Sequence, residues 1–265
     1  MIVIVKMEDD RMDVVFVEDY EAMSRRAAEI VAGQIRQKPD SVLGLATGST
    51  PLGLYHLLCR WYAAGRLDFS AVTTFNLDEY IGLSPAHPQS YHAFMQEHLF
   101  SKVNLCPARC FLPDGMAGDV LAEAGRYNAR IEAAGGIDLQ VLGIGRNGHI
   151  GFNEPDDHFA VRTHRAYLSD DTIQANARFF PRLADVPREA ISVGMGAIMK
   201  AQRVVLLASG PDKAEAVRRA VCGVVTPRVP ASILQLHRAA TVLVDAAAAA
   251  LVPEKWCHAG RIYIG

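Results

Sequence analysis

Short apolar runs separated by longer amphipathic segments constrain the fold of this chain more than any other feature of its sequence. Six runs have the length and near-continuous apolar character of strands covered on both faces, and such strands belong to parallel sheets. They are Val42–Ala46, Val72–Asn76, Leu139–Ile144, Ile191–Gly194, Val204–Ala208 and Thr241–Asp245. The apolar residues that open the chain, in MIVIVKMEDD, predict a further strand.

The segments between these runs have helical periodicity. In Tyr20–Gln37, for example, Ala27, Val31 and Ile35 share roughly one helical face. The other expected helices are Pro51–Ala64, Tyr91–Phe100, Val120–Ala134, Asp170–Arg178 and Asp212–Val221. Strands that alternate with helices form right-handed βαβ units, so we expect the α/β class: one doubly wound domain over residues 1–265, with a mostly parallel sheet flanked by helices.

Composition and charge narrow the possible functions. Lys and Arg number 27 against 29 Asp and Glu, a net charge of −2, so we expect no nucleic-acid partner. The longest apolar stretch, Ala246 to Val252, is too short to span a membrane, and the opening residues do not resemble a secretory signal. The five cysteines are scattered and form no zinc pattern, which predicts free thiols, no bound metal and a cytoplasmic location.

The expected fold also predicts where a ligand binds. In open α/β sheets, ligands lie at the carboxyl ends of the strands. The loops that follow Ala46, Asn76 and Ile144 are therefore the candidate site, and they carry the chemically richest residues of the chain.

The first of these loops, Thr47–Pro51, leads from a strand into a helix. Free backbone N–H groups at the helix start and the nearby hydroxyls favour an anion site, although an ordinary capped helix start is the alternative. Arg178 and Lys213 lie in other segments, and each alone has the character of a surface charge. Together with Gly48–Thr50 they form a plausible phosphate-binding cluster.

The second loop contains adjacent carboxylates, Asp78 and Glu79. Neighbouring side chains of an extended segment point apart, so one can face the ligand while the other makes structural contacts. A partly buried carboxylate with a raised pKa suits proton abstraction from carbon. A solvated acidic loop is the alternative interpretation.

The third loop, Gly143–Pro155, contains a GxGxxG pattern typical of dinucleotide binding. That fingerprint must open a helix, whereas Gly151 and Pro155 make a poor helix start, so we expect no nicotinamide cofactor. The glycines instead allow a sharp turn that directs His149 toward the ligand. Glu154 is near enough in sequence to orient its imidazole.

Taken in order, six segments resemble the glucosamine-6-phosphate deaminase family, also called glucosamine-6-phosphate isomerases. They are LGLATGSTPLGLY, TFNLDEYIGL, HPQSYHAFM, LGIGRNGHIGFNEP, ANARFF and ASGPDKAEAV, and the resemblance covers about residues 20 to 245. It implies a Rossmann-like fold and a reaction without metal or redox cofactor. In that reaction, glucosamine 6-phosphate and water give fructose 6-phosphate and ammonia.

The resemblance also implies roles for individual residues. Asp78 corresponds to the base that moves a proton between C2 and C1 of the sugar, and His149 to the residue that opens the sugar ring. Asn147 and Glu154 correspond to the groups that assist ring opening. The phosphate-binding residues implied are Gly48, Ser49, Thr50, Arg178 and Lys213.

Two departures from the family pattern matter. Many members carry Asp where this chain has Asn147, which leaves Glu154 as the only charged neighbour of the histidine in this motif. Allosterically regulated members carry Arg and Lys where this chain has His164 and Ala166, so we expect no activation by N-acetylglucosamine 6-phosphate. The family includes monomers and hexamers, so a homo-oligomer stays open.

Two alternative enzyme functions stay open, and a non-catalytic function is a distant third. A galactosamine-6-phosphate deaminase differs only in the orientation of one substrate hydroxyl, and 6-phosphogluconolactonases have similar Gly-rich and Asp-Glu loops. A non-catalytic sugar-phosphate sensor of the repressor type needs a DNA-binding segment and a basic face that this chain lacks. The segments His87–Met95 and Asp157–Tyr167 are the candidates for a lid.

Overall fold

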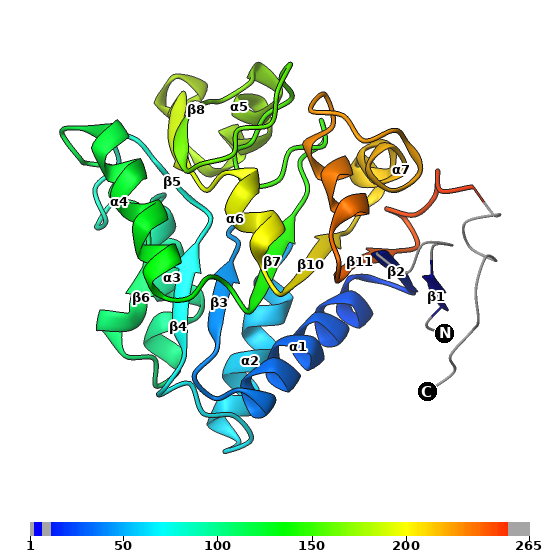
Figure 1. Cartoon of the computed structure of the whole chain (residues 1–265), viewed down its shortest axis with the longest axis horizontal. Coiled ribbons are helices and arrows are strands. Elements are labelled where there is room, and N and C mark those ends of the chain that lie inside the picture. Colours follow the sequence, from blue (N-terminus) through cyan, green and yellow to red (C-terminus); the bar gives the residue numbers. More distant parts are fainter. Residues whose placement is uncertain (1–2, 7–11, 254–265) are drawn as a thin grey trace.

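An eight-stranded sheet forms the centre of the computed structural model, which describes residues 3–6 and 12–253 (Figure 1). Its strand order is β1-β2-β11-β10-β7-β3-β4-β6. The bounds are β1 Val3–Lys6, β2 Met12–Val17, β3 Val42–Leu45, β4 Thr73–Asn76, β6 Cys110–Phe111, β7 Leu139–Gly143, β10 Arg203–Ala208 and β11 Ala240–Asp245. Only β1 and β2 pair in antiparallel fashion; the other neighbours are parallel, which confirms the predicted class.

Helices cover both faces of this sheet. On one face α1 (Tyr20–Gln37), α2 (Leu52–Ala63) and α3 (Tyr91–His98) pack on the strands in one apolar cluster. On the other face α4 (Val120–Ala133), α6 (Met195–Lys200) and α7 (Ala214–Cys222) belong to a second cluster. The arrangement is the doubly wound one that the sequence predicts.

The predicted helices occur close to their expected bounds, with differences at their ends. The segment predicted as Asp170–Arg178 is α5 (Asp170–Asn176) followed by a 3₁₀ turn, Ala177–Phe179. The segment predicted from Asp212 begins with a 3₁₀ turn, Pro211–Lys213, and continues as α7. Among the described residues, no helix is both long enough and apolar enough to cross a membrane.

A second, three-stranded antiparallel sheet corrects one expectation. It consists of β5 (Asp78–Tyr80), β9 (Glu189–Ser192) and β8 (His164–Tyr167), in that order. The apolar run at Ile191–Gly194 was expected in the parallel sheet, and this was wrong. Ala190 and Ile191 are fully buried, but burial of both faces is also met in this small sheet, whose Ala190 packs with Tyr80 and Phe152.

The predicted free thiols can be followed for part of the chain. Cys59, Cys106 and Cys110 form no disulfide. Cys257 lies outside the described residues.

Candidate active site

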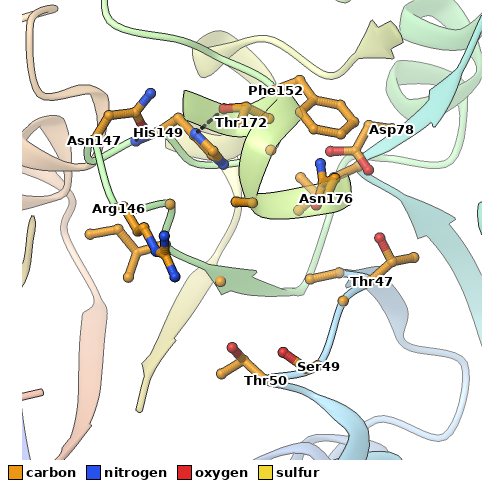
Figure 2. Close-up of a pocket in the computed structure, with 18 of the residues that line it drawn as sticks. Thr47, Ser49, Thr50, Asp78, Arg146, Asn147, His149, Phe152, Thr172 and Asn176 are labelled. Atoms are coloured by element: carbon orange, nitrogen blue, oxygen red, sulfur yellow. Dashed lines mark hydrogen bonds between the residues drawn. The ribbon is translucent and has the colours of Figure 1, made fainter. Parts of the chain in front are cut away.

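A pocket opens at the carboxyl ends of β3, β4 and β7, where the three chemically rich loops meet (Figure 2). Eight of the nine residues selected from the sequence line it directly: Gly48, Ser49, Thr50, Asp78, Asn147, His149, Arg178 and Lys213. Glu154 does not line the pocket but contacts His149 from behind. Asp78 and His149 therefore face the same cavity.

Two buried tyrosines fix the ends of the strands that carry the first two loops. The Tyr55 hydroxyl, from α2, donates to the carbonyl oxygen of Ala46 at 2.5 Å, just past β3. The Tyr127 hydroxyl, from α4, donates to the carbonyl oxygen of Asn76 at 2.7 Å, at the end of β4. Both side chains are fully buried. The helices on opposite faces of the sheet therefore hold the ends of β3 and β4 in place beside the pocket.

Asp78 is a carboxylate in an unusually dry environment. The residue is 6% exposed, and within residues 12–253 no hydrogen bond reaches its carboxylate oxygens. Burial, with a smaller contribution from the charge of Glu79, raises the pKa of Asp78 to about 8. Once ionised, such a carboxylate is a better proton acceptor than a solvent-exposed aspartate.

Glu79 points away from the pocket and has a structural role. Its Oε1 accepts the backbone N–H groups of Tyr80 and Tyr91, and its Oε2 accepts that of His92, each at 2.9 Å. Burial raises the pKa of Glu79, and these three donors oppose the rise. The two adjacent carboxylates thus point apart as expected, Asp78 into the pocket and Glu79 to the start of α3.

The loop after β7 presents His149 without forming a helix. The N–H of Gly145 donates to the carbonyl oxygen of His149 at 2.9 Å, and Gly148 has the positive φ of +91° that a tight turn requires. A Cβ atom on Gly145 would lie 2.2 Å from Cε1 of His149, so the imidazole occupies the space of a missing side chain. No helix begins within residues 143–155, whereas the dinucleotide-binding GxGxxG pattern must open a helix.

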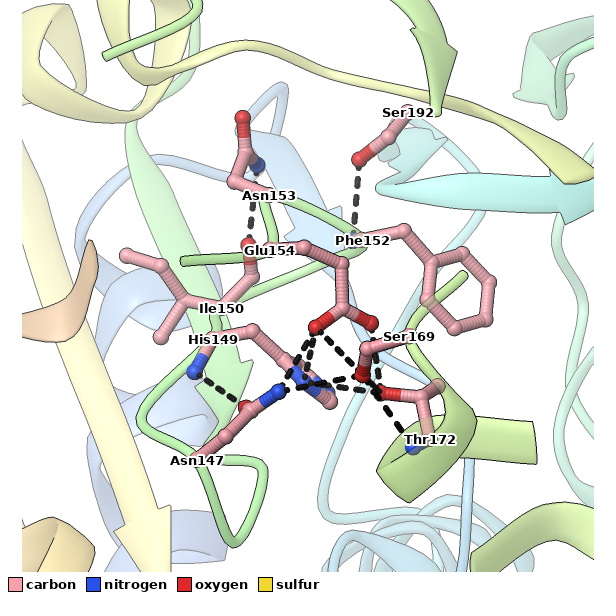
Figure 3. A network of polar contacts seen from close by, with 9 residues as sticks. All are labelled: Asn147, His149, Ile150, Phe152, Asn153, Glu154, Ser169, Thr172 and Ser192. Atoms are coloured by element: carbon pink, nitrogen blue, oxygen red, sulfur yellow. Dashed lines mark hydrogen bonds and ion pairs between the residues drawn. The ribbon is translucent and has the colours of Figure 1, made fainter. Parts of the chain in front are cut away.

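Behind the imidazole, four side chains converge on Glu154 (Figure 3). His149 Nδ1 lies 3.6 Å from Glu154 Oε2, and Asn147 Nδ2 donates to the same oxygen at 2.7 Å. Ser169 donates to Oε2 at 3.0 Å and Thr172 to Oε1 at 2.5 Å. Burial raises the pKa of Glu154, but the adjacent imidazole, Thr172 and Asn147 outweigh it and lower the pKa to about 2. Glu154 is therefore ionised at neutral pH.

The opposite side of the pocket is basic. Arg178 donates to Ser49 Oγ at 3.1 Å, and Gly48 has a φ of +93° that turns the loop at this point. Burial lowers the pKa of the Lys213 ammonium; the charge of Asp212 opposes this, while Arg146 and Arg178 add to it. Such a group of cations beside the hydroxyls of Ser49 and Thr50 favours a dianionic ligand group. The free N–H groups expected at the start of α2 are partly used, because the N–H of Gly53 donates to the Tyr20 hydroxyl at 2.8 Å.

Several residues of the site carry no recognisable signal in the sequence. Arg146 lies within a quoted motif but was given no role; it lines the pocket and forms an ion pair with Asp212 at 3.0 Å. Ser169 and Thr172 were also missed, because their importance depends on Glu154, a residue distant in sequence. In the described part of the chain, no three His, Cys, Asp or Glu side chains converge as a metal site would require.

The chain resembles proteins of known function over most of its length. The family described as glucosamine-6-phosphate isomerases/6-phosphogluconolactonase matches residues 18–243. A curated glucosamine-6-phosphate deaminase of Halothermothrix orenii is 57% identical over 91% of this chain and all of that protein. One from Clostridioides difficile is 54% identical over 92% of this chain and 98% of the relative.

Solved structures separate into near and distant relatives. A monomeric glucosamine-6-phosphate deaminase superposes with a TM-score of 0.88 at 48% identity, covering 90% of this chain and 99% of the other. A 6-phosphogluconolactonase from Leishmania guyanensis superposes with a TM-score of 0.67 at 22% identity, over 89% of this chain and 96% of the other. At that identity the second likeness concerns the fold alone.

Proposed function

Because the chain belongs to the family of glucosamine-6-phosphate isomerases and 6-phosphogluconolactonases, we infer that it is a glucosamine-6-phosphate deaminase. The observation that carries this inference is the identity of 50–57% to curated deaminases over most of the chain. The pocket supports it independently, because a dry carboxylate, an imidazole backed by a carboxylate and a basic cluster line one cavity.

The first step of the proposed mechanism is ring opening at His149. The C2 hydrogen of the sugar becomes acidic only when C1 is an aldehyde, so the pyranose must open first. In our proposal His149 takes the proton of the C1 hydroxyl and returns a proton to the ring oxygen as the C1–O5 bond breaks. Glu154, ionised and 3.6 Å from Nδ1, stabilises the imidazolium that forms in between.

Asp78 then carries the isomerisation. Its ionised carboxylate removes the proton from C2 while the C1 oxygen takes up a proton from the substrate's ammonium group, which gives an enolamine. The protonated Asp78 then delivers its proton to C1 on the same face. The product is an imine at C2. Water adds to this imine and ammonia leaves, so that C2 becomes the ketone of fructose 6-phosphate. The absence of hydrogen-bond donors to Asp78 within residues 12–253 keeps the carboxylate basic enough for this proton transfer.

The phosphate group of the substrate takes no part in bond making. We place it among Gly48, Ser49, Thr50, Arg178 and Lys213, with Arg146 as an additional cation. Binding energy from this remote group positions C1 and C2 between Asp78 and His149, which lowers the barrier of the chemical steps.

The remaining assignments are also proposals. We expect a sugar phosphate as the small-molecule substrate, no nucleic-acid partner in view of the net charge of −2, and a cytoplasmic site of action.

The decisive test measures ammonia and fructose 6-phosphate together from glucosamine 6-phosphate. The wild-type protein should release both in equal amounts. Asp78→Asn should still bind the sugar phosphate but lose at least about a hundredfold in kcat, the usual size of a general-base contribution. Galactosamine 6-phosphate and 6-phosphogluconolactone serve as competing substrates. Faster turnover of either of these, or binding of glucosamine 6-phosphate without ammonia release, would refute the assignment.

A further inference from the structure

Thr172 contacts His149, the proposed ring-opening residue, from α5, a helix that no sequence motif links to that residue. The residue lies in the first turn of α5, is 4% exposed and lines the pocket. Its Oγ1 lies 2.5 Å from Glu154 Oε1 and 3.4 Å from His149 Nδ1 (Figure 3). One hydroxyl group therefore bridges the carboxylate and the imidazole.

The Thr172 hydroxyl can donate a hydrogen bond to only one of these two neighbours. A threonine hydroxyl has one hydrogen to donate, and the ionised Glu154 at 2.5 Å can only accept it. The Thr172 oxygen therefore presents lone pairs, and no hydrogen, to His149 Nδ1. The Ser169 hydroxyl, 3.1 Å from Thr172, donates in turn to Glu154 Oε2 at 3.0 Å or to Thr172 itself. Either choice leaves Thr172 an acceptor toward the imidazole.

Two groups that face Nδ1 are thus both acceptors, Thr172 Oγ1 at 3.4 Å and Glu154 Oε2 at 3.6 Å. In a neutral imidazole one nitrogen carries the hydrogen and the other accepts, so these neighbours favour the hydrogen on Nδ1. Nε2, at the opposite edge of the ring, is then the nitrogen with the free lone pair in the pocket. Only in this tautomer can Nε2 take a proton from the sugar.

We propose that Thr172 is a positioning residue for the reaction: it anchors Glu154 and keeps His149 in the tautomer with hydrogen on Nδ1. The proposal rests on the deaminase function inferred above. It differs from a purely structural role in α5, because Ser169 already caps this helix, with its side chain accepting the N–H of Thr172 at 3.3 Å. The Thr172 side-chain hydroxyl is not needed for the cap.

The test compares Thr172→Val, which keeps the shape and removes the hydroxyl, with Thr172→Ser, which restores it. Thr163→Val is the matched control, since Thr163 is equally buried, lies outside the pocket and has no hydrogen-bond partner for its hydroxyl among the described residues. Three quantities are measured for each variant. They are the kinetic constants kcat and KM, the affinity for the reduced open-chain substrate (the aminohexitol 6-phosphate), and the ¹⁵N spectrum of the His149 ring.

For Thr172→Val we expect kcat to fall by about tenfold or more, as for partial loss of a general acid–base group. KM and the affinity for the aminohexitol phosphate should stay within about twofold, because that probe needs no ring opening. The ¹⁵N spectrum should show hydrogen on Nδ1 in the wild type and a mixture of tautomers in the variant. Thr172→Ser and Thr163→Val should match the wild type in all three.

Wild-type His149 with its hydrogen on Nε2 would overturn the proposal, and so would Thr172→Val with unchanged kcat and tautomer. A parallel loss of aminohexitol affinity and kcat would also refute it, since that pattern belongs to a structural role. If Thr172→Val does not fold, the wild-type ¹⁵N spectrum still tests which ring nitrogen carries the hydrogen. Thr172→Ser then still tests whether a hydroxyl at this position is enough for wild-type kcat. Failure of the proposed function is distinguishable, because the wild type would then release no ammonia whatever the tautomer.

Discussion

At the scale of single residues, Asp78 departs most from an ordinary carboxylate. Its pKa of about 8 lies well above the value of an aspartate in an unfolded chain, about 4. The folded protein therefore binds this proton more tightly than the unfolded chain does. As a result, Asp78 makes the free energy of unfolding fall as pH rises from about 4 to about 8, after which the penalty stays constant.

Replacing this carboxylate by a neutral isostere should remove the penalty. We expect Asp78→Asn to be as stable as the wild type near about pH 4, where both side chains are neutral. At about pH 8 the variant should be more stable by at least about 1 kcal/mol, the equivalent of roughly one pKa unit. Urea unfolding across this range measures the difference.

Glu79→Gln is the control for this experiment, because Glu79 accepts three backbone N–H groups and its replacement should lower stability. A stability difference between Asp78→Asn and the wild type that does not change with pH would contradict the raised pKa.

Asn147 contacts both the Glu154 carboxylate and the backbone of the His149 loop. Its Nδ2 donates to Glu154 Oε2 at 2.7 Å, and its Oδ1 accepts the backbone N–H of His149 at 3.1 Å. An ionised aspartate at this position could make the second contact but would repel Glu154 in the first. The amide therefore fits a site in which Glu154 alone carries the negative charge.

At the scale of elements, the small antiparallel sheet connects the two proposed catalytic loops. Asp78 of β5 pairs with Ser192 of β9. The Ser192 hydroxyl in turn accepts the backbone N–H of Phe152, in the loop of His149, at 3.0 Å. The strand that was assigned to the wrong sheet is thus the one that fixes Asp78 relative to the loop of His149.

The loop after β7 can be tested through its closest contact. In Gly145→Ala the new methyl group would overlap the His149 ring, with its Cβ 2.2 Å from Cε1 and 2.3 Å from Nδ1. Because the ring must move, we expect kcat to fall by at least about a hundredfold, the scale of a general acid–base contribution. Ammonia release at saturating substrate measures this loss.

Gly33→Ala is the matched control, because Gly33 lies in α1 and a Cβ there meets no atom within 4 Å. It should keep wild-type activity and gain a little thermal stability, since alanine favours a helix over glycine. Wild-type turnover in Gly145→Ala would show that the position of the His149 ring does not matter for the reaction.

At the scale of the whole molecule, a second cavity of about 250 Å³ lies between β8 and the loop that contains Glu154. Its lining includes His164 and Arg165. Burial lowers the pKa of His164; the carbonyl of Arg162 opposes this and His158 adds to it, so His164 is neutral at neutral pH. Arg165 is already paired with Glu189 at 2.5 Å. The cavity therefore offers a phosphate ester little positive charge.

We accordingly expect hyperbolic kinetics with glucosamine 6-phosphate. Adding N-acetylglucosamine 6-phosphate up to millimolar concentration should change neither kcat nor KM by more than about twofold, which corresponds to a coupling free energy below about 0.5 kcal/mol. Initial rates over a matrix of both compounds, together with the molecular mass in solution, provide the measurement. Sigmoidal curves that the acetylated sugar makes hyperbolic would contradict this expectation.

The sequence by itself determined the α/β class, the loops that form the pocket and the expectation that Asp78 and Glu79 point apart. These features follow from periodicity and from the geometry of neighbouring residues, which are local properties. Only the tertiary structure decided that β9 joins a separate sheet and that Tyr55 and Tyr127 fix the strand ends. It also decided that Thr172 meets Glu154 across 18 positions of sequence. Contacts of this kind depend on how helices and strands pack in space, and no local pattern of residue types encodes that packing.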